Sequence, residues 1–362
     1  MMIPFINTLV ASVLGLSIPQ TSATIVFAGD AMQHGKQLQM ATTDKGTYDF
    51  TASFLPITDW VSAADYAVVN LETPLGDSDF KGYPEFNAPV AYAESLKKAG
   101  FDLFLLANNH ALDRRDKGLR RTIALLDSMK VDNIGAYTNA EYRKKKMPFI
   151  KNIKGFKVGM LNYTYGTNGI PIREDVVIDM INNDKMAADI KATRDAGAEL
   201  VVVNIHWGDE YKLLPPESVK RIADFLCKQD VDMVIGGHPH VIQPMEVRTN
   251  PTTGKPLLLV YSMGNLISNM TTPVASRGGA MVKTVIERDE NGVARFKSAE
   301  YMPHFTVPGK SFKDNYRVVM LPTDDKVDSD IPSEYRSLAR SWLETVIPVF
   351  DKNNVSVSRA SN

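Results

Sequence analysis

The apolar residues of the chain gather into short runs separated by stretches of helical spacing. Runs rich in Val, Ile, Leu and aromatic residues predict strands at 24–28, 66–70, 101–107, 158–163, 200–205, 231–235 and 257–262. Their nearly continuous apolar character is typical of strands buried on both faces of a sheet. The stretches between them predict helices at 91–98, 119–129, 185–195 and 218–228. This alternation indicates an α/β core.

The pattern becomes more antiparallel in character after residue 279. The segments 280–288 and 294–307 predict β-structure joined at Glu290-Asn291-Gly292, where Asn-Gly favours a hairpin turn. A further helix is expected at 333–346. An α/β core is therefore followed by a β region and a terminal helix.

The simplest domain organisation is one compact unit with a C-terminal appendage. We expect the main domain to cover 24–310 and the extension to cover 311–362, with one helix and a polar tail. The tail, residues 351–362, is polar and expected to fray. No internal repeat or low-complexity linker divides the chain.

Residues 1–23 differ from the rest of the chain and predict a signal peptide. They contain no charged residue, hold the apolar run 9–16, and end in Thr21-Ser22-Ala23, whose small residues suit a signal-peptidase site. The missing Lys or Arg ahead of the run leaves a disordered leader as the alternative. Run 9–16 is too short to span a membrane, and no later run is long and apolar enough. We expect an exported protein, periplasmic or extracellular.

Composition narrows the possible classes of function. Of 362 residues, 44% are hydrophobic and 23% charged, as in ordinary globular proteins, and the formal net charge of -1 does not predict nucleic-acid binding. The single cysteine, Cys227, excludes an internal disulfide framework and a thiolate metal cage. It lies in a helix-like stretch, where a buried hydrophobic role is expected. The chain also lacks the Walker, His-Glu-x-x-His and Gly-x-Ser-x-Gly motifs.

Residues suited to metal chemistry recur where the predicted strands end. The motifs in chain order are Gly29-Asp30, Asn70-Leu71-Glu72, Asn108-Asn109-His110, His206-Trp207-Gly208, Gly236-Gly237-His238-Pro239-His240 and Gly264-Asn265. Sites in open α/β sheets form at the carboxyl ends of strands, so these motifs can converge on one crevice. His238 and His240 lie two residues apart, which in an extended stretch points both imidazoles the same way. Incidental histidines in a glycine turn are the alternative for this motif.

The donor set indicates a site for two divalent metal ions. Imidazole and carboxylate groups suit Zn, Mn or Fe, and two metals that share a carboxylate can clamp a phosphoryl group. The candidate ligands are Asp30, Glu72, Asn109, His206, His238 and His240. Five of the six histidines lie in or beside these motifs, and that clustering is what raises a metal site above chance.

Taken in order, these motifs resemble the CapA-type proteins of poly-γ-glutamate capsule biosynthesis, within the calcineurin-like metallophosphoesterase superfamily. The resemblance runs from about residue 24 to about residue 270 and includes the stretch His206-Trp207-Gly208-Asp209-Glu210-Tyr211. It implies a four-layer αββα sandwich of two mixed sheets, with the metals at the strand ends. This expectation agrees with the pattern of runs and motifs.

The resemblance also implies a role for each residue of the site. Asp30 and His240 would bind the first metal, and Glu72 would hold the position of the bridging acid. The second metal would be bound by Asn109, His206 and His238. His110 would not bind metal; it would act on the substrate as proton donor or charge stabiliser. A hydroxide between the metals would be the nucleophile.

The chain departs from the wider superfamily at three places. The usual Asp-x-His opening is absent, and His34, four residues after Asp30, either fills that ligand place or is a surface residue. Glu72 replaces the usual bridging Asp. Ala111 stands where an acid normally orients the histidine, although Asp113 is near in sequence. With these changes, we still expect metal binding, whereas the resemblance implies phosphatase chemistry less firmly.

Three further residues have two interpretations each. Asn265 is either a group that supports a ligand or a turn residue. Glu210 either orients His206 or touches substrate, or it is a solvated loop acid. Arg114 either meets an anionic substrate or lies on a solvated face. His304 lies outside every motif, and we assign it no role.

Two functions follow from these observations. The first is a metal-dependent hydrolase that acts on a phosphoester or related bond in an envelope polymer, of the poly-γ-glutamate or cell-wall type. The alternative is a non-catalytic metal-binding accessory protein in the synthesis or export of an anionic polymer. The expected partner is an anionic polymer or a phosphorylated envelope substrate. Both functions use the same ligands and differ in whether a hydroxide is activated.

Overall fold

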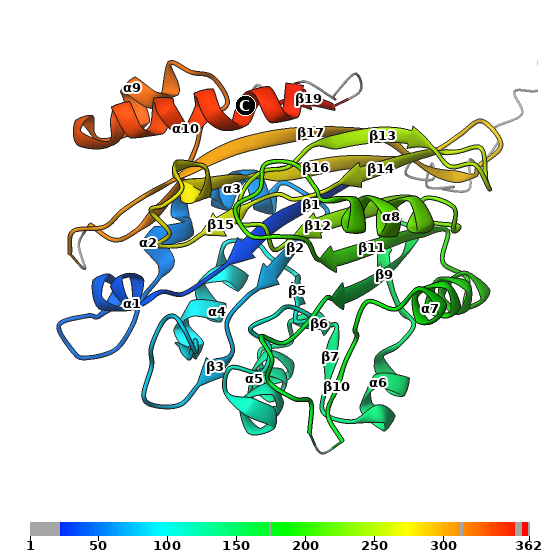
Figure 1. Cartoon of the computed structure of the whole chain (residues 1–362), viewed down its shortest axis with the longest axis horizontal. Coiled ribbons are helices and arrows are strands. Elements are labelled where there is room, and N and C mark those ends of the chain that lie inside the picture. Colours follow the sequence, from blue (N-terminus) through cyan, green and yellow to red (C-terminus); the bar gives the residue numbers. More distant parts are fainter. Residues whose placement is uncertain (1–21, 174, 312–313, 352–356, 361–362) are drawn as a thin grey trace, which may run out of the picture.

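Two β-sheets pack face to face, and helices cover the outer face of each (Figure 1). The computed structural model describes residues 22–173, 175–311, 314–351 and 357–360. The predicted leader therefore lies outside the described residues up to Thr21, while Ser22 and Ala23 begin the first strand. Within the described ranges, no helix combines the length and the apolar character that a membrane crossing requires.

The first sheet has nine strands and is mixed. Along its main path the strands are β18 (Arg317–Met320), β17 (Ala294–Val307), β16 (Gly278–Arg288), β1 (Ser22–Ala31), β2 (Tyr66–Leu71), β5 (Leu103–Leu105) and β6 (Asp132–Ile134). Two strands join off this path: β15 (Asn265–Ile267) on β1 and β19 (Val357–Arg359) on β17. The strands from β1 to β6 are parallel, whereas the β16–β17 hairpin and β18 are antiparallel.

The second sheet has six strands. In order they are β13 (Met245–Thr249), β14 (Pro256–Val260), β12 (Met233–Gly237), β11 (Leu200–His206), β9 (Phe156–Thr164) and β8 (Phe149–Ile153). The four inner strands are parallel and the two edge strands are antiparallel. Two small ribbons complete the β-structure: β3 (Leu75–Gly76) with β4 (Ala88–Pro89), and β7 (Ala136–Tyr137) with β10 (Val177–Ile178).

The helices form the two outer layers. They are α1 (Gly35–Ala41), α2 (Thr51–Phe54), η1 (Leu55–Ile57), α3 (Thr58–Ser62), α4 (Val90–Lys98), α5 (Arg115–Ser128), α6 (Ala140–Lys146), α7 (Asn183–Asp195), α8 (Glu217–Leu226), η2 (Val274–Arg277), α9 (Lys326–Asp330) and α10 (Ser333–Asp351). Apolar residues of α2 to α5 pack on the outer face of the first sheet, and those of α7 and α8 pack on the second. Between the sheets, Phe27 and Val68 meet Met160 and Val202 in a third apolar core. The expected αββα sandwich is confirmed.

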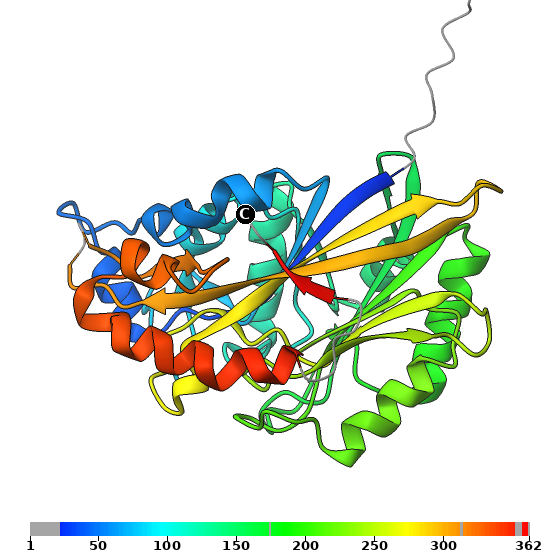
Figure 2. The ribbon, with the colours of Figure 1, turned by 90° about the horizontal axis from the view of Figure 1, so that it is seen from above.

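The C-terminal segment is built into the first sheet more closely than expected. β18 extends that sheet, and α10 runs alongside the long strand β17 (Figure 2). Trp342 of α10 packs against Phe305 of β17 with ring centroids 6.0 Å apart. The expected helix is present as α10, but α9 precedes it. The expectation of a frayed tail is wrong for 357–359, because Val357 is buried and this stretch pairs with β17 as β19. The rest of the tail, 352–356 and 361–362, lies outside the described residues.

Candidate metal centre

The strand-end motifs of both sheets meet at one edge of the sandwich. Asp30 of β1 is paired in register with Asn70 of β2 and with Asn265 of β15. In the second sheet, His206 of β11 is paired with Gly237 of β12. Parallel strands end at the same edge, and so the register alone brings these motifs together. The strand-end motifs therefore converge at one edge, as the sequence predicts.

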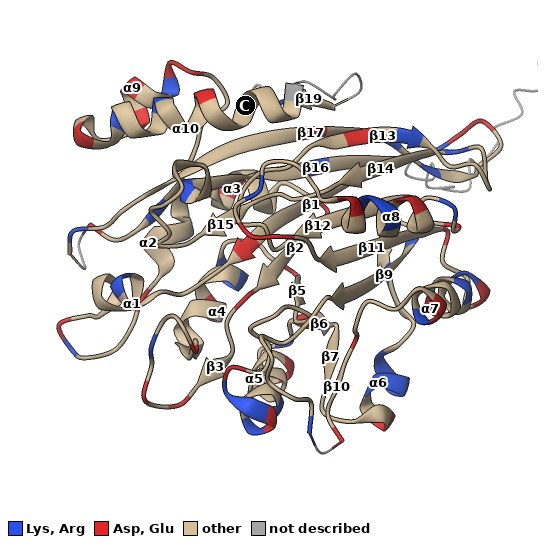
Figure 3. Cartoon of the chain, in the orientation of Figure 1, with Lys and Arg blue, Asp and Glu red and all other residues tan. Residues whose placement is uncertain are grey.

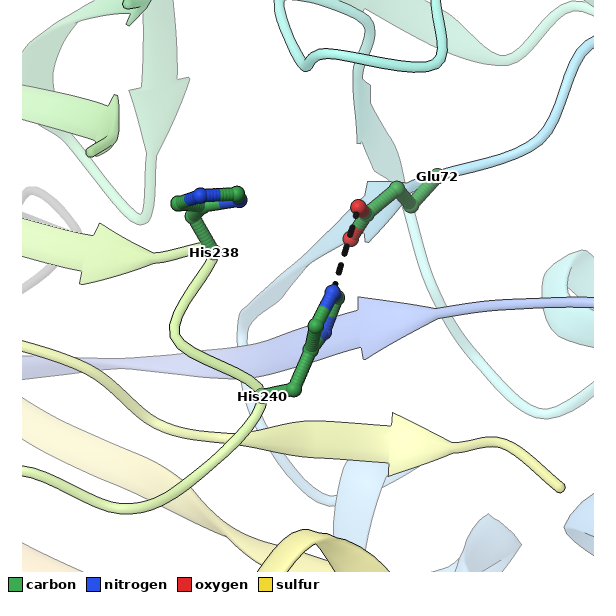
Figure 4. A group of neighbouring side chains, drawn as sticks. All are labelled: Glu72, His238 and His240. Atoms are coloured by element: carbon green, nitrogen blue, oxygen red, sulfur yellow. Dashed lines mark ion pairs between the residues drawn. The ribbon is translucent and has the colours of Figure 1, made fainter. Parts of the chain in front are cut away.

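Two fully buried carboxylates lie at the middle of this edge. The ligand atoms of Asp30, Glu72 and His206 lie within 4.8 Å of one another, and so do those of Glu72, His238 and His240. Figure 4 shows the second group, with Glu72 facing His240 across a dashed ion pair of 3.9 Å between Oε1 and Nε2. Glu72 belongs to both groups, as a bridging acid must.

The donor atoms fit divalent metal ions. Among the described residues, Glu72 Oε1 and His238 Nδ1 are buried without a hydrogen-bond partner. A buried carboxylate oxygen without a partner is costly, and a coordinated cation removes that cost. The set of imidazole, carboxylate and amide oxygen atoms suits Zn, Mn or Fe. The residues present therefore fit divalent metal ions of this kind.

The remaining ligand candidates lie on either side of Glu72. His206 Nε2 lies 2.7 Å from Asn109 Oδ1 and 3.5 Å from Glu72 Oε1. His240 Nδ1 lies 3.3 Å from Asp30 Oδ2 and 2.9 Å from Asn265 Oδ1. The expected division, in which Asn109, His206 and His238 serve one metal and Asp30 and His240 the other, stays a prediction. The two ligand groups cut across it, because Asp30 falls with His206 and His238 falls with His240.

The backbone of the His-Pro-His segment is strained. His238 has φ +100° and His240 has φ +57°, a region that side-chain-bearing residues rarely adopt. Asp30 Oδ2 accepts the backbone N–H of His238 at 3.1 Å. A Cβ on Gly237 would lie 2.9 Å from Asp30 Oδ1, so glycine is what lets this turn approach the carboxylate.

Charges at the site shift the protonation of its groups. Burial would raise the pKa of Asp30, but the hydrogen bond with His240 and the nearby His206 outweigh it and hold that pKa far below its usual range. Burial lowers the pKa of His238 to about 2, and the neighbouring His206 and His240 add to the effect. Burial also opposes the charge on His240, yet Glu72 and Asp30 raise its pKa to about 9. In the metal-free site, Asp30 and Glu72 thus favour a positive charge beside them, which the protonated ring of His240 supplies.

His110 has an acid partner after all. Its Nδ1 lies 2.7 Å from Asp113 Oδ2, and both residues are buried. The same carboxylate oxygen accepts the backbone N–H of Phe86 at 2.8 Å, and the Phe86 ring packs edge-on against His110 at 4.7 Å. Ala111 therefore does not leave the histidine without an orienting acid, because Asp113 supplies the carboxylate from two residues further on.

The residues with two interpretations are placed as follows. Asn265 contacts His240 and also donates to Ser276 O at 2.9 Å, so it fixes the ring of a candidate ligand. His34 lies outside both ligand groups; its Nδ1 accepts the backbone N–H of Asn269 at 3.3 Å, and burial lowers its pKa to about 4.

Two charged candidates lie further from the ligands. Glu210 is exposed and does not orient His206, whose ring nitrogens face Asn109 and Asn70. Arg114 caps α5, a helix rich in Lys and Arg (Figure 3), and lines a separate hollow with Asp77, Lys117 and other residues.

Sequence reasoning gave no role to Asn70, although it stands in a strand-end motif, and it missed Asn168 and Tyr165. Asn70 Nδ2 donates to Asp30 Oδ1 at 2.7 Å and lies 3.4 Å from Glu72 Oε2. Asn168 Oδ1 accepts from Asn109 at 3.0 Å, and the Tyr165 ring lies 4.5 Å from that of His238. Both Asn168 and Tyr165 follow the carboxyl end of β9, and a strand end is the signal that marks the other residues of the site.

Comparisons with known proteins agree with this geometry. The family model described as "Bacterial capsule synthesis protein PGA_cap" matches residues 24–270. The chain is 29% identical over 255 residues to capsule biosynthesis protein CapA of Bacillus anthracis, covering 67% of this chain and 59% of that protein. It is 27% identical over 308 residues to PGA biosynthesis protein CapA of Bacillus subtilis (strain 168), covering 80% and 74% respectively.

More distant similarities follow. A probable polyglutamine synthesis accessory protein of Mycobacterium tuberculosis is 25% identical over 230 residues, covering 58% of this chain and 57% of that protein. Among solved structures, NAD nucleotidase of Haemophilus influenzae has a TM-score of 0.50 and 14% identity, covering 93% of this chain and 57% of that one. Similarity at that identity concerns the fold. The chain thus spans little more than half the length of several of the proteins it matches.

Proposed function

Since the chain belongs to the CapA-type family of bacterial capsule synthesis (PGA_cap) proteins, we propose that it is a metal-dependent hydrolase of capsule-polymer metabolism. Its target would be a phosphoester or related bond in an envelope component. One observation carries this proposal: the buried His110–Asp113 pair stands directly after Asn109, a candidate metal ligand. A site that only binds metal has no need of a histidine oriented by an acid beside its ligands.

Each residue has a defined part in the proposed reaction. Asp30, Glu72, His206, His238 and His240, with Asn109, would hold two divalent ions. Bound ions of this kind polarise phosphoryl oxygens and lower the pKa of coordinated water. Since Asp113 engages His110 Nδ1, it is Nε2 that would hold the proton offered to the leaving oxygen. Asp113 would fix that ring orientation and stabilise its positive charge.

A second candidate function is a non-catalytic accessory role in the synthesis or export of an anionic polymer. Two observations favour it: Glu72 replaces the usual bridging Asp, and the related mycobacterial protein is named an accessory protein. In that role the same metals would bind polymer carboxylates. We also propose an exported protein, with residues 1–23 as its signal peptide and an anionic polymer or phosphorylated envelope molecule as its partner.

Metal analysis combined with an ester assay tests the proposal. The purified chain is assayed on an aryl phosphate with and without added Mn or Zn, together with His240→Ala, His110→Ala and Lys145→Ala, an exposed residue of α6 as control. The hydrolase predicts metal-dependent turnover that both histidine variants lose, while His110→Ala keeps its metal. Stoichiometric metal without turnover on any ester would favour the accessory role. Less than one metal per chain under all conditions would contradict a site for two metals.

A further inference from the structure

Two partly exposed tyrosines lie against the candidate metal ligands. Tyr165 is 45% exposed; its ring is stacked on His206 at 6.4 Å and lies 4.5 Å from the ring of His238. Tyr211 is 39% exposed, and its ring lies 6.2 Å from that of His240. Single exposed aromatic rings are ordinary on a protein surface, but these two lie against candidate metal ligands. Here they flank both ends of the His238–His240 pair.

The backbone holds both tyrosines against the site. Tyr165 follows β9, and its N–H donates to His206 O at 3.0 Å. Tyr211 has φ +64°, an unfavourable conformation for a bulky residue, and its N–H donates to Pro239 O at 2.8 Å. Strain of this kind persists only where the surroundings enforce it, and it is common at ligand sites. Backbone hydrogen bonds therefore hold Tyr165 to His206 and Tyr211 to Pro239, which lies between two candidate ligands.

An acid lies beside the two rings. Burial raises the pKa of Tyr165 and of Tyr211 to about 12, and the charge of Glu210 is the next contribution in each case. Glu210 precedes Tyr211 in the chain and forms a side-chain hydrogen bond with it, so this exposed carboxylate lies against that phenol. Both phenols stay protonated near neutral pH and can donate hydrogen bonds. The exposed carboxylate of Glu210 can accept them from a ligand.

We propose that Tyr165, Tyr211 and Glu210 form a sugar-binding subsite at the mouth of the metal centre. Aromatic faces pack against the apolar face of a sugar ring, while the carboxylate and phenols pair with its hydroxyls. The ester hydrolysed would then carry a hydroxyl-rich ring, with its phosphoryl group on the metals. Asp209 and Glu210 outnumber Lys212 in this segment, which disfavours a polycarboxylate chain in the same place. This inference rests on the proposed hydrolase function and specifies its substrate class.

Binding of non-hydrolysable phosphonates tests the subsite without turnover. Calorimetry on the Mn-loaded chain would compare methylphosphonate, phenylphosphonate and a glucosyl methylphosphonate in which CH2 replaces the ester oxygen. We expect the glucosyl compound to bind at least tenfold more tightly than methylphosphonate. Tyr165→Ala and Glu210→Gln should each reduce that preference, measured as the ratio of the two affinities within the same metal-loaded variant, to less than threefold. Leu55→Ala, an exposed apolar residue of η1, serves as control and should change nothing.

Other outcomes overturn the inference. Equal affinity for the glucosyl and methyl compounds, or no binding of either, would contradict a subsite. Tighter binding of phenylphosphonate than of the glucosyl compound would contradict a sugar-binding subsite and indicate a subsite for a planar ring. The hydrolase is tested separately by turnover of glucose 1-phosphate: ring-dependent binding without turnover would contradict the hydrolase alone, and turnover without a ring preference would contradict the subsite alone.

Discussion

Asp30 accepts the backbone N–H of His238 at 3.1 Å, across 208 residues of sequence. This hydrogen bond joins the end of β1 in the first sheet to the loop after β12 in the second. Because His238 has φ +100°, the bond also compensates for part of the strain in the His-Pro-His segment. Asp30, itself a candidate metal ligand, therefore also holds the loop that carries two other candidate ligands.

Substitutions of Asp30 should separate these two roles. Asp30→Asn keeps an oxygen that can accept the His238 N–H but removes the charge that His206 and His240 stabilise, so we expect loss of metal and a loss of metal-free stability that reflects the charge alone. Asp30→Ala should also leave the buried N–H without a partner and lower the free energy of unfolding by a further amount of about 1–3 kcal/mol. Metal analysis and urea unfolding in the presence of a chelator provide the two measurements. Equal metal-free stability of the two variants would show that the hydrogen bond contributes nothing.

We expect Glu72 to be required for the stabilisation of the fold by bound metal. Metal bound only by the folded state at about 100 times its Kd stabilises by about 2.7 kcal/mol, so a chelator should lower the Tm of the wild-type chain. Glu72→Gln preserves the shape of a fully buried side chain but removes the charge common to both ligand groups. Its Tm should be insensitive to chelator and to added Mn, as thermal scans can show. A variant that still responds like the wild type would argue against a bridging role.

The His110–Asp113 pair gives a kinetic prediction. Asp113→Asn should lower kcat on an aryl phosphate at least about 100-fold, because the ring loses the carboxylate that accepts its Nδ1–H and stabilises the doubly protonated form that offers the Nε2 proton. Residues that act as a unit are not additive, so His110→Ala with Asp113→Asn should be no slower than His110→Ala alone. Metal content should be unchanged in all three variants. If the double variant instead shows the product of the two single-variant decreases in kcat, Asp113 acts independently of His110.

His304 should contribute a pH dependence to stability. It is fully buried, its Nε2 donates to Asn265 O at 3.0 Å, and burial lowers its pKa from 6.5 to about 4. In the unfolded chain the His304 ring is protonated below about pH 6.5, whereas in the folded chain it is protonated only below about pH 4. The free energy of unfolding therefore decreases as the pH is lowered from 6.5 to 4. Urea unfolding of the metal-free protein at pH 7 and pH 4.5 should show a decrease that is about 2 kcal/mol larger for the wild type than for His304→Gln. Equal decreases would mean that His304 is protonated in the fold.

Most of the layered fold was predictable because long apolar runs make strands visible in the sequence. The runs at 66–70 and 200–205 correspond closely to β2 and β11. Strands of two or three residues, such as β3 and β15, were not predicted, because so few residues carry no periodicity. The helices between Thr51 and Ser62 are too short to show a helical repeat.

The site was predictable where its residues stand in strand-end motifs and not where contacts cross the chain. Asp30, Glu72 and the histidines were found in this way. Asn168, in contrast, meets Asn109 across 59 residues, and nothing local to it marks that contact. Tyr165 was passed over because a tyrosine after an apolar run is ordinary core composition until its exposure is known.

The C-terminal segment gives the last prediction, since the sequence suggested an appendage and the structure packs it on the first sheet. Trp342 of α10 is fully buried, its Nε1 donates to Ala275 O at 3.2 Å, and its ring packs against Phe305. Trp342→Ala should lower the free energy of unfolding by about 3–5 kcal/mol through the cavity and the lost hydrogen bond. Trp342→Phe should lose less, because it keeps most of the packing. Urea unfolding measures both, and a loss below about 1 kcal/mol for Trp342→Ala would mean that α10 unfolds independently of the sheet.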